Sequence, residues 1–270
     1  MNNHMKCLPS APYPENEKPK LALLEKLFVD WHQHFVNNGS TLKKHKADDM
    51  VFDGFCPGYF SQKKRILIIG KEPRWISGQN YIDILYPRYR ENKKVGSTYV
   101  NNDRFHNRMI KIVYGILNEM PEWKDIDDAD KLGDTLSTAN GLSFACMNIS
   151  KLSNDSDQWQ TDRDVFNEAH RLSTNGRNFI EEEIAILEPQ IIIAMTLKEK
   201  LASLGTLSVW IPESAGVKSC VKSCWLESCG HRSLLIDSYH FSWPFGQDIA
   251  HYYNPICDAI RHSEAVAVAE

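Results

Sequence analysis

The sequence predicts an α/β domain, a three-layer α/β/α sandwich around a central four-stranded, mainly parallel sheet. Four nearly continuous apolar runs support this prediction, because the strands of a parallel sheet are buried on both faces by helices. Segments with helical spacing of apolar residues lie between these runs, which is the alternation typical of an α/β fold. The predicted strands span residues 65–70, 142–149, 190–195 and 233–238.

Helices are predicted from the spacing of apolar residues around these strands. The first covers residues 21–36 and ends at the Asn-Asn-Gly-Ser stretch 37–40. Others cover 107–119, 165–187 with a break at 174–176, and 248–262. Residues 1–20 are expected to form a flexible lead, because 8–20 are rich in Pro, Glu and Lys. Residues 21–270 then form a single domain with an N-terminal helical extension and long loops.

Composition narrows the class of protein. The chain has 270 residues, of which 42% are hydrophobic and 24% charged, and a formal net charge of −4. This balance excludes a protein that holds nucleic acid mainly by bulk positive charge. No apolar stretch approaches the ~20 residues needed to cross a bilayer, and the polar N-terminus lacks the apolar run of a secretion signal. We therefore expect a soluble, cytoplasmic protein without a membrane partner.

The cysteines do not suggest a disulfide scaffold, because seven in a chain of this length are sparse and odd in number. Cys220, Cys224 and Cys229, followed by His231, offer thiolate and imidazole ligands that suit Zn²⁺. Their gaps of three and four residues differ from the Cys-x2-Cys spacing of common structural zinc sites. We expect ordinary loop cysteines and no bound metal, with a zinc site as the alternative.

Side chains able to do chemistry follow three of the four predicted strands. The first strand is followed by Gly70-Lys71-Glu72-Pro73-Arg74-Trp75, the second ends near Asn148, and the last is followed by Tyr239-His240-Phe241-Ser242. Ligands of α/β sheets bind outside the carboxyl ends of the strands. The sequence therefore predicts that a carboxylate, a carboxamide and an imidazole converge on one pocket.

The order of these segments resembles that of the uracil-DNA glycosylase superfamily. That family opens its site with a Gly-x-x-Pro turn, matched by 70–73, and closes it with a His-Pro-Ser-like segment, matched by 240–242. An apolar strand ending in Asn lies between them, as at Met147-Asn148-Ile149. The resemblance spans residues 52–242 and implies the family's fold and a base-recognising pocket without an organic cofactor.

Three departures from the family pattern are visible. Phe241 replaces the proline of His-Pro-Ser, and Glu72 stands where one branch keeps its water-activating Asp. The longer Glu side chain would shift the activated water, which matters at the ~1 Å level. The four-cysteine iron–sulfur set of some branches is not reproduced, so we expect no cluster.

Hydrolysis of an N-glycosidic bond assigns a role to each residue type. A carboxylate, here Glu72, orients water and stabilises a cationic sugar, and a donor, here His240, stabilises the charge on the departing base. Asn148 offers the donor and acceptor that reading a pyrimidine edge requires. Gly70, Lys71, Pro73 and Ser242 complete the predicted substrate-binding segments. An aromatic residue must stack on the base, and the candidates are Trp75, Phe105 and Phe144.

Each of these residues also has an ordinary structural interpretation. Glu72 could pair with Lys71 or Arg74 on a turn, Asn148 could cap the segment after its strand, and His240 could be a packed core histidine. The function therefore stays open between a glycosylase acting on DNA, a non-catalytic binding module of the same fold, and a protein that binds or hydrolyses a free nucleotide or nucleoside.

A basic, aromatic-lined rim around the pocket would favour DNA over a small molecule. The basic residues of the N-terminal third either form such a rim or are ordinary solvated loop residues. They are Lys43, Lys44, Lys46, Lys63, Lys64, Arg65, Arg88, Arg90, Lys93 and Lys94.

Overall fold

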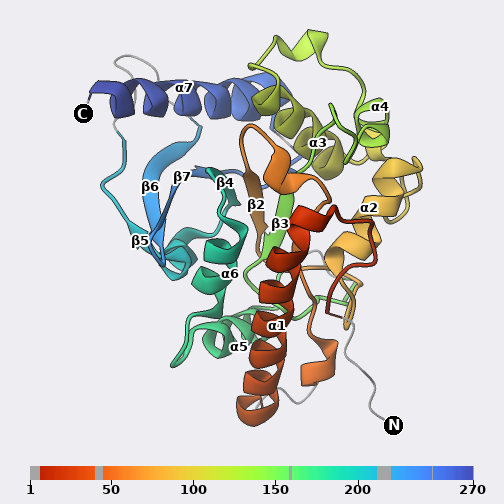
Figure 1. Ribbon diagram of the computed structural model, residues 1–270, viewed down its shortest axis with the longest axis vertical. Helices are drawn as coiled ribbons and strands as arrows, with labels where there is room; N and C mark the ends of the chain where they lie inside the picture. Colours follow the sequence, from red (N-terminus) through yellow and green to blue (C-terminus); the bar gives the residue numbers. More distant parts are fainter. Residues whose placement is uncertain (1–6, 40–44, 158–159, 212–219, 245, 270) are drawn as a thin grey trace.

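The computed structural model has an α/β fold with one mixed seven-stranded sheet and helices packed on both of its faces (Figure 1). It describes all residues except 1–6, 40–44, 158–159, 212–219, 245 and 270. The predicted α/β class is therefore confirmed, whereas the predicted four-stranded sheet is too small. No helix in the described part of the chain is long and apolar enough to span a membrane.

The centre of the sheet consists of the four predicted strands. They are β2 (Ile66–Gly70), β3 (Ala145–Asn148), β4 (Ile191–Met195) and β7 (His231–Ser238), in the order β3-β2-β4-β7 and all parallel. Every residue of β2, β3 and β4 is buried, which explains their continuous apolar runs. The register places Gly70, the last residue of β2, opposite Asn148, the last of β3.

Three antiparallel strands extend this centre on both sides, and the sequence prediction missed them. β1 (Gly54–Phe55) pairs with β3, and β6 (Lys222–Ser228) pairs with β7 and with β5 (Thr206–Leu207). β1 and β5 are only two residues long, and β6 mixes buried with exposed positions. Neither feature produces the continuous apolar run by which the central strands were recognised.

Helices cover the two faces of the sheet, and each face has its own apolar core. One face carries α1 (Lys18–Asn38), α5 (Arg163–Thr174) and α6 (Phe179–Leu187), which pack on the odd-numbered residues Leu67 and Ile69 of β2. On the other face, Ile66 and Ile68 of β2 belong to the second core. This face is covered by α2 (Tyr81–Arg90), α3 (Arg104–Leu117), α4 (Ala129–Asp134), a π-helical turn (Asp248–Tyr253) and α7 (Asn254–Ala269).

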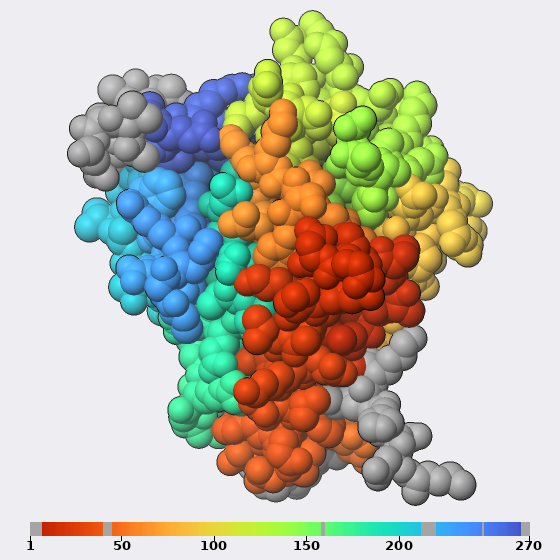
Figure 2. All heavy atoms as spheres, in the orientation of Figure 1, coloured from red at the N-terminus to blue at the C-terminus, as the bar shows by residue number. Residues whose placement is uncertain are grey.

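The described part of the expected flexible lead packs against the domain instead. Cys7 is buried and its carbonyl accepts a hydrogen bond from the side chain of Asn80, while the hydroxyl of Tyr13 donates to the carbonyl of Phe55. Glu17 is also buried and accepts two main-chain N–H groups. These bonds hold the segment against the domain. Figure 2 shows the red N-terminal segment lying against the orange segment that follows it.

Candidate active site

The connections of β2 and β3 leave the sheet on opposite faces. The helices after β2 belong to the face of α2 and α3, whereas those after β3 are α5 and α6 on the other face. In doubly wound sheets, ligands bind beyond the carboxyl ends of the strands at such a switch point. Glu72, Asn148 and His240 follow or end three parallel strands, so all three lie at this carboxyl edge.

The Gly-x-x-Pro turn runs alongside the segment that follows β3. The main-chain carbonyls of Gly70, Lys71 and Pro73 accept hydrogen bonds from the N–H groups of residues 149, 150 and 154, at 3.1, 2.8 and 2.9 Å. A Cβ atom on Gly70 would lie 2.8 Å from Oδ1 of Asn148, closer than Cβ contacts occur in proteins. The two segments therefore form one surface, and the close approach requires glycine at position 70.

Glu72 is half-buried, and its Oε1 accepts a hydrogen bond of 2.9 Å from Nδ2 of Asn154. Burial raises the pKa of Glu72, and hydrogen bonds from Asn154 and Thr161 together with the charge of Arg74 only partly offset this effect. A carboxylate whose pKa remains raised although neutral donors hold it is a stronger base than an exposed one. The charge of Arg74, one of the partners in the alternative interpretation, thus acts on Glu72 together with a hydrogen bond from the segment that follows β3.

His240 is half-buried and its imidazole is neutral at physiological pH. Burial lowers the pKa of His240 to about 4, and the nearby ammonium group of Lys71 acts in the same direction. Nδ1 lies 2.6 Å from the hydroxyl of Ser242 and accepts the main-chain N–H of Ser242 at 3.3 Å. Because Nδ1 is an acceptor, the proton of the neutral ring is on Nε2. The side chain thus offers one N–H donor.

Arg108 of α3 holds the segment that contains His240, and the sequence analysis missed this role. The Arg108 side chain is only 4% exposed. Its guanidinium donates hydrogen bonds to the carbonyls of Phe241, Trp243 and Gly246, at 2.5, 3.1 and 2.6 Å. It also forms an ion pair with Asp248 at 2.6 Å. The hydroxyl of Tyr252 donates to the carbonyl of His240 at 3.0 Å. The loop after β7 is therefore bonded to the helical layer along its length.

The three aromatic candidates for base stacking occupy different environments. The Phe105 ring centroid lies 5.3 Å from that of His240, with an interplanar angle of 30°. Trp75 is 57% exposed and has a positive φ of 57°. Phe144 is fully buried in the core beside Tyr89, so the assignment of Phe144 as a stacking residue was wrong: no face of its ring is available to a ligand.

A buried ionic cluster in contact with Asn148 was also missed. Asp53, which directly precedes β1, accepts the main-chain N–H of Asn148 at 2.8 Å and forms an ion pair with Lys151. Lys151 also pairs with Glu183 of α6 at 2.6 Å. The charged residue inside the apolar stretch 51–55 was the available signal, but its partners are distant in the sequence.

The cysteine group is spread along the hairpin of β6 and β7. Cys224 pairs with Leu235, whereas His231 pairs with Ser228, four positions further along the ladder. At about 3.3 Å per residue this separation is roughly 13 Å, too far for two ligands of one zinc ion. Among the residues that the structure describes, no group of three or more His, Cys, Asp or Glu side chains is arranged to hold a metal ion.

The predicted basic rim is divided between different parts of the molecule. Lys63, Lys64 and Arg65 precede β2 and therefore lie at its amino end, the edge opposite the candidate site, which excludes them from the rim. Arg88 donates to the carbonyls of Ile84 and Lys94 at the end of α2. Residues 43 and 44 fall outside the described part of the chain.

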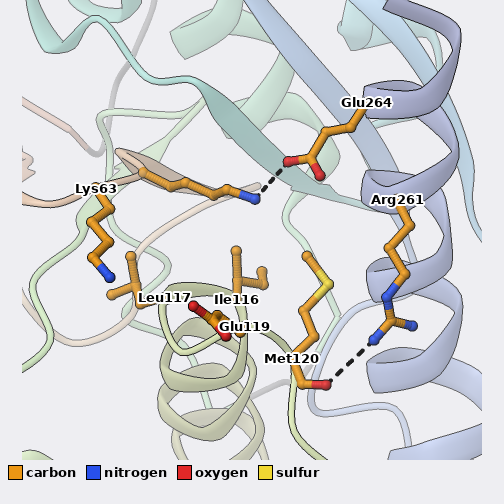
Figure 3. A pocket seen from close by; sticks show the side chains of 8 residues that line it. Lys63, Ile116, Leu117, Glu119, Met120, Arg261 and Glu264 are labelled. Atoms are coloured by element: carbon orange, nitrogen blue, oxygen red, sulfur yellow. Dashed lines mark hydrogen bonds and ion pairs between the residues drawn. The ribbon is translucent and has the colours of Figure 1, made fainter. Parts of the chain in front are cut away.

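A cavity of about 360 Å³ lies at that amino edge, between the end of α3 and one face of α7 (Figure 3). Lys64 pairs there with Glu264 at 2.6 Å, and Arg261 donates to the carbonyl of Met120 at 3.3 Å. These charged groups are satisfied by the protein itself, and none of the predicted site residues lines this cavity.

The candidate active site therefore consists of the turn 70–73, Asn148, His240 with Ser242, and Phe105. Comparisons of the chain with protein-family models and with curated proteins found no match.

Proposed function

We propose that this chain is a nucleobase-recognising protein of the uracil-DNA glycosylase type that hydrolyses an N-glycosidic bond in DNA. The observation that carries the proposal is the state of His240: a neutral imidazole with its proton on Nε2, beside the ring of Phe105 and close to Lys71. A neutral donor stabilises negative charge on a departing base without first having to lose a proton. The three-layer sandwich of the proposed family agrees with helices on both faces of the sheet.

In the proposed reaction, the bond between C1′ of the sugar and the base nitrogen breaks and its electron pair leaves with the base. His240 donates a hydrogen bond to an oxygen of the base, where the negative charge accumulates, and the ammonium of Lys71 adds electrostatic stabilisation. Glu72 stabilises the cationic sugar and orients a water molecule. The water oxygen bonds to C1′, and its proton passes to the Glu72 carboxylate, whose raised pKa suits it as a base.

Binding of the base is assigned to the residues around this centre. Phe105 supplies the stacking surface next to His240, and the amide of Asn148 contacts the polar edge of the base. Trp75, which follows the turn 70–73 and is exposed, is the second candidate for an aromatic contact with DNA. Bases must leave the duplex to reach such a pocket, so a mismatched or single-stranded target is favoured.

Single-turnover cleavage of a panel of oligonucleotides with different damaged bases tests the proposal. Glu72→Gln should slow cleavage ~100-fold or more while binding persists, because glutamine keeps the shape but lacks the negative charge. His240→Ala should also slow cleavage, and Asn148→Asp should change which base is accepted. Glu91→Gln is the matched control, since Glu91 is exposed at the end of α2 and pairs only locally with Lys93.

A non-catalytic module that binds DNA or a nucleotide-like small molecule is the second candidate. The hydrogen bond from Asn154 to Glu72 favours it, because it engages the carboxylate oxygen that a water molecule would otherwise use. Measurable binding of oligonucleotides or nucleotides without turnover of any base would establish this alternative. Unchanged turnover in Glu72→Gln would contradict the catalytic role of the carboxylate.

A further inference from the structure

Glu119 occupies a position where the end of a helix favours neither a side chain nor a negative charge. It follows Asn118, the residue that caps α3, and has a left-handed φ of 62°. The N–H of Met120 donates to the carbonyl of Gly115 at 2.8 Å, and in helix ends of this kind the position of Glu119 is usually glycine. A side chain there strains the backbone, and a carboxylate adds negative charge at the negative end of the helix dipole.

The described part of the protein offers no partner for this carboxylate. Among the residues it contains, Glu119 makes no side-chain hydrogen bond or ion pair, and neither does the ammonium of Lys63. Both residues line the cavity of about 360 Å³ at the amino edge of the sheet. A strained residue whose charge has no partner within the protein indicates a role in binding.

The apolar surface of this cavity comes from the end of α3 and the residue after Glu119. Ile116 is 2% exposed, and Leu117 and Met120 are half-buried. Figure 3 shows the side chains of Ile116 and Met120 between Lys63 on the left and Arg261 on the right. An apolar surface with a few charged groups around it, in a volume of this size, is typical of small-molecule sites.

The segments around the cavity are joined to one another by the other charged side chains. Arg261 of α7 donates to the carbonyl of Met120 at 3.3 Å, which ties the loop after α3 to α7. Lys64 pairs with Glu264 at 2.6 Å, which ties the segment before β2 to the same helix. These groups are used within the protein, so the two unpaired charges of the cavity are the ones available to a ligand.

The charges of the cavity are mixed in sign. Its lining contains three basic residues, Lys63, Lys64 and Arg261, and two acidic ones, Glu119 and Glu264. A ligand with only a negative charge meets unpaired carboxylate, and a ligand with only a positive charge meets unpaired ammonium. A ligand that carries both charges and an apolar part matches the whole lining.

We propose that this cavity is a second binding site, which takes a small zwitterion of the α-amino acid class with an aliphatic side chain. The ammonium of Lys63, on its flexible stem, binds the carboxylate of the ligand, and Glu119 binds the amino group. The end of α3 that disfavours Glu119 adds to the attraction of the amino group. The aliphatic part packs on Ile116, Leu117 and Met120. The site lies at the edge opposite the candidate active site and does not depend on the proposed function.

Titration calorimetry of the full chain with three ligands of similar shape tests the need for both charges. L-leucine carries both charged groups, isocaproate lacks the amino group, and isoamylamine lacks the carboxylate. The wild-type protein should bind leucine with a Kd of about 1 mM or lower. Each of the other two should bind about fivefold more weakly, because one charged contact at a solvent-exposed rim is lost.

Two variants should each remove one half of this selectivity. Glu119→Gln should weaken leucine binding about fivefold and leave isocaproate unchanged, because isocaproate has no amino group. Lys63→Gln should weaken leucine binding by a similar factor and leave isoamylamine unchanged. Glu122→Gln is the matched control, because Glu122 pairs with Lys124 at the surface and does not line the cavity, so all three affinities should stay the same.

Thermal unfolding of Glu119→Gly separates loss of binding from loss of structure. Glycine adopts the left-handed conformation without strain, so the variant should unfold about 2 °C higher or more, yet lose its preference for leucine over isocaproate. Absence of leucine binding at about 10 mM, or equal affinities of the wild type for leucine and isocaproate, overturns the inference. So does an unchanged leucine affinity in Glu119→Gln and Lys63→Gln. The oligonucleotide panel tests the proposed function separately from all of these outcomes.

Discussion

At the scale of single residues, Gly70 joins the two halves of the candidate site. It ends β2 opposite Asn148, and its missing side chain leaves room for the Asn148 amide, which would otherwise lie 2.8 Å from a Cβ atom. Asn148 cannot retreat, because its N–H groups are bonded to Asp53. Position 70 therefore has no room for a side chain, because the Asn148 amide next to it is held in place by Asp53.

Gly70→Ala should displace the Asn148 amide and weaken base binding about tenfold, the effect of one lost hydrogen bond in a buried site. Overpacking at this position should also lower the free energy of unfolding by about 1–3 kcal/mol. Gly96→Ala is the control, because Gly96 has a φ of +65° but open space around it, so alanine strains the backbone without touching a neighbouring group. Equal base affinity in Gly70→Ala and the wild type would contradict the contact.

The pH dependence of activity should be determined by Glu72. The pKa of Glu72 is raised, so on acidification Glu72 becomes protonated at a higher pH than an exposed glutamate does. His240, with a pKa of about 4, stays neutral while Glu72 is protonated. We expect kcat/KM to fall below neutral pH with the loss of one charge. The residual activity of Glu72→Gln should stay flat down to about pH 4. A midpoint near 6.5 that survives in Glu72→Gln would instead indicate an ordinary histidine.

At the scale of elements, α3 does more than cover the sheet. Phe105 at its start lies against His240, and Arg108, one turn later, bonds the loop that carries His240. Because both residues belong to the first turns of one helix, the stacking surface and the imidazole share a rigid support. The loop after β7 is thereby held in place by a helix whose Arg108 precedes Phe241 by 133 positions.

Arg108→Met should loosen this loop without removing any group that touches the substrate. Three carbonyls and Asp248 lose their donor, which should cost about 3 kcal/mol of stability or more. The pKa of His240 should rise from about 4 toward 6.5 as water reaches the ring, and kcat should fall more than KM changes. Proton NMR of the imidazole measures this pKa. Arg171→Met, at an exposed pair with Glu168, should change neither quantity.

At the scale of the whole molecule, the Asp53–Lys151–Glu183 cluster connects three parts of the fold. Asp53 precedes β1, Lys151 follows β3, and Glu183 lies on α6, with Trp31 of α1 covering the ammonium. The cluster is therefore buried between the sheet and the α1 and α6 layer. A buried ionic cluster contributes little net stability, because the attraction between its charges is offset by the cost of removing them from water.

Lys151→Met should destabilise the protein by about 3–5 kcal/mol, because it leaves two carboxylates buried without a cation. Burial already raises the pKa of Glu183, and loss of Lys151 raises it further. The folded variant then binds more protons than the unfolded chain, so its stability should increase as the pH falls from 8 to 6. Urea unfolding at both pH values measures this. Lys18→Met, at an exposed pair with Glu15, should change stability by less than about 1 kcal/mol.

The sequence was informative where one local property identified an element. β2 and β4 were recognised because all their residues are buried and apolar, and the break between α5 and α6 followed from Thr174-Asn175-Gly176. α2 was missed because its apolar pattern is weak and Pro87 lies inside it, and α4 because it is only six residues long. β6 was missed because an antiparallel strand near the sheet edge mixes buried and exposed residues.

The sequence by itself determined the α/β class, the four parallel strands and the polar residues at their carboxyl ends, because burial on both faces and strand termination are local properties. Only the tertiary structure decided how those residues are oriented and charged. Asp53 reaches Asn148 across 95 positions, and Arg108 reaches Phe241 across 133. Hydrogen bonds over such separations, and the loss of solvent that shifts the pKa of His240, depend on how the whole chain packs and leave no local pattern.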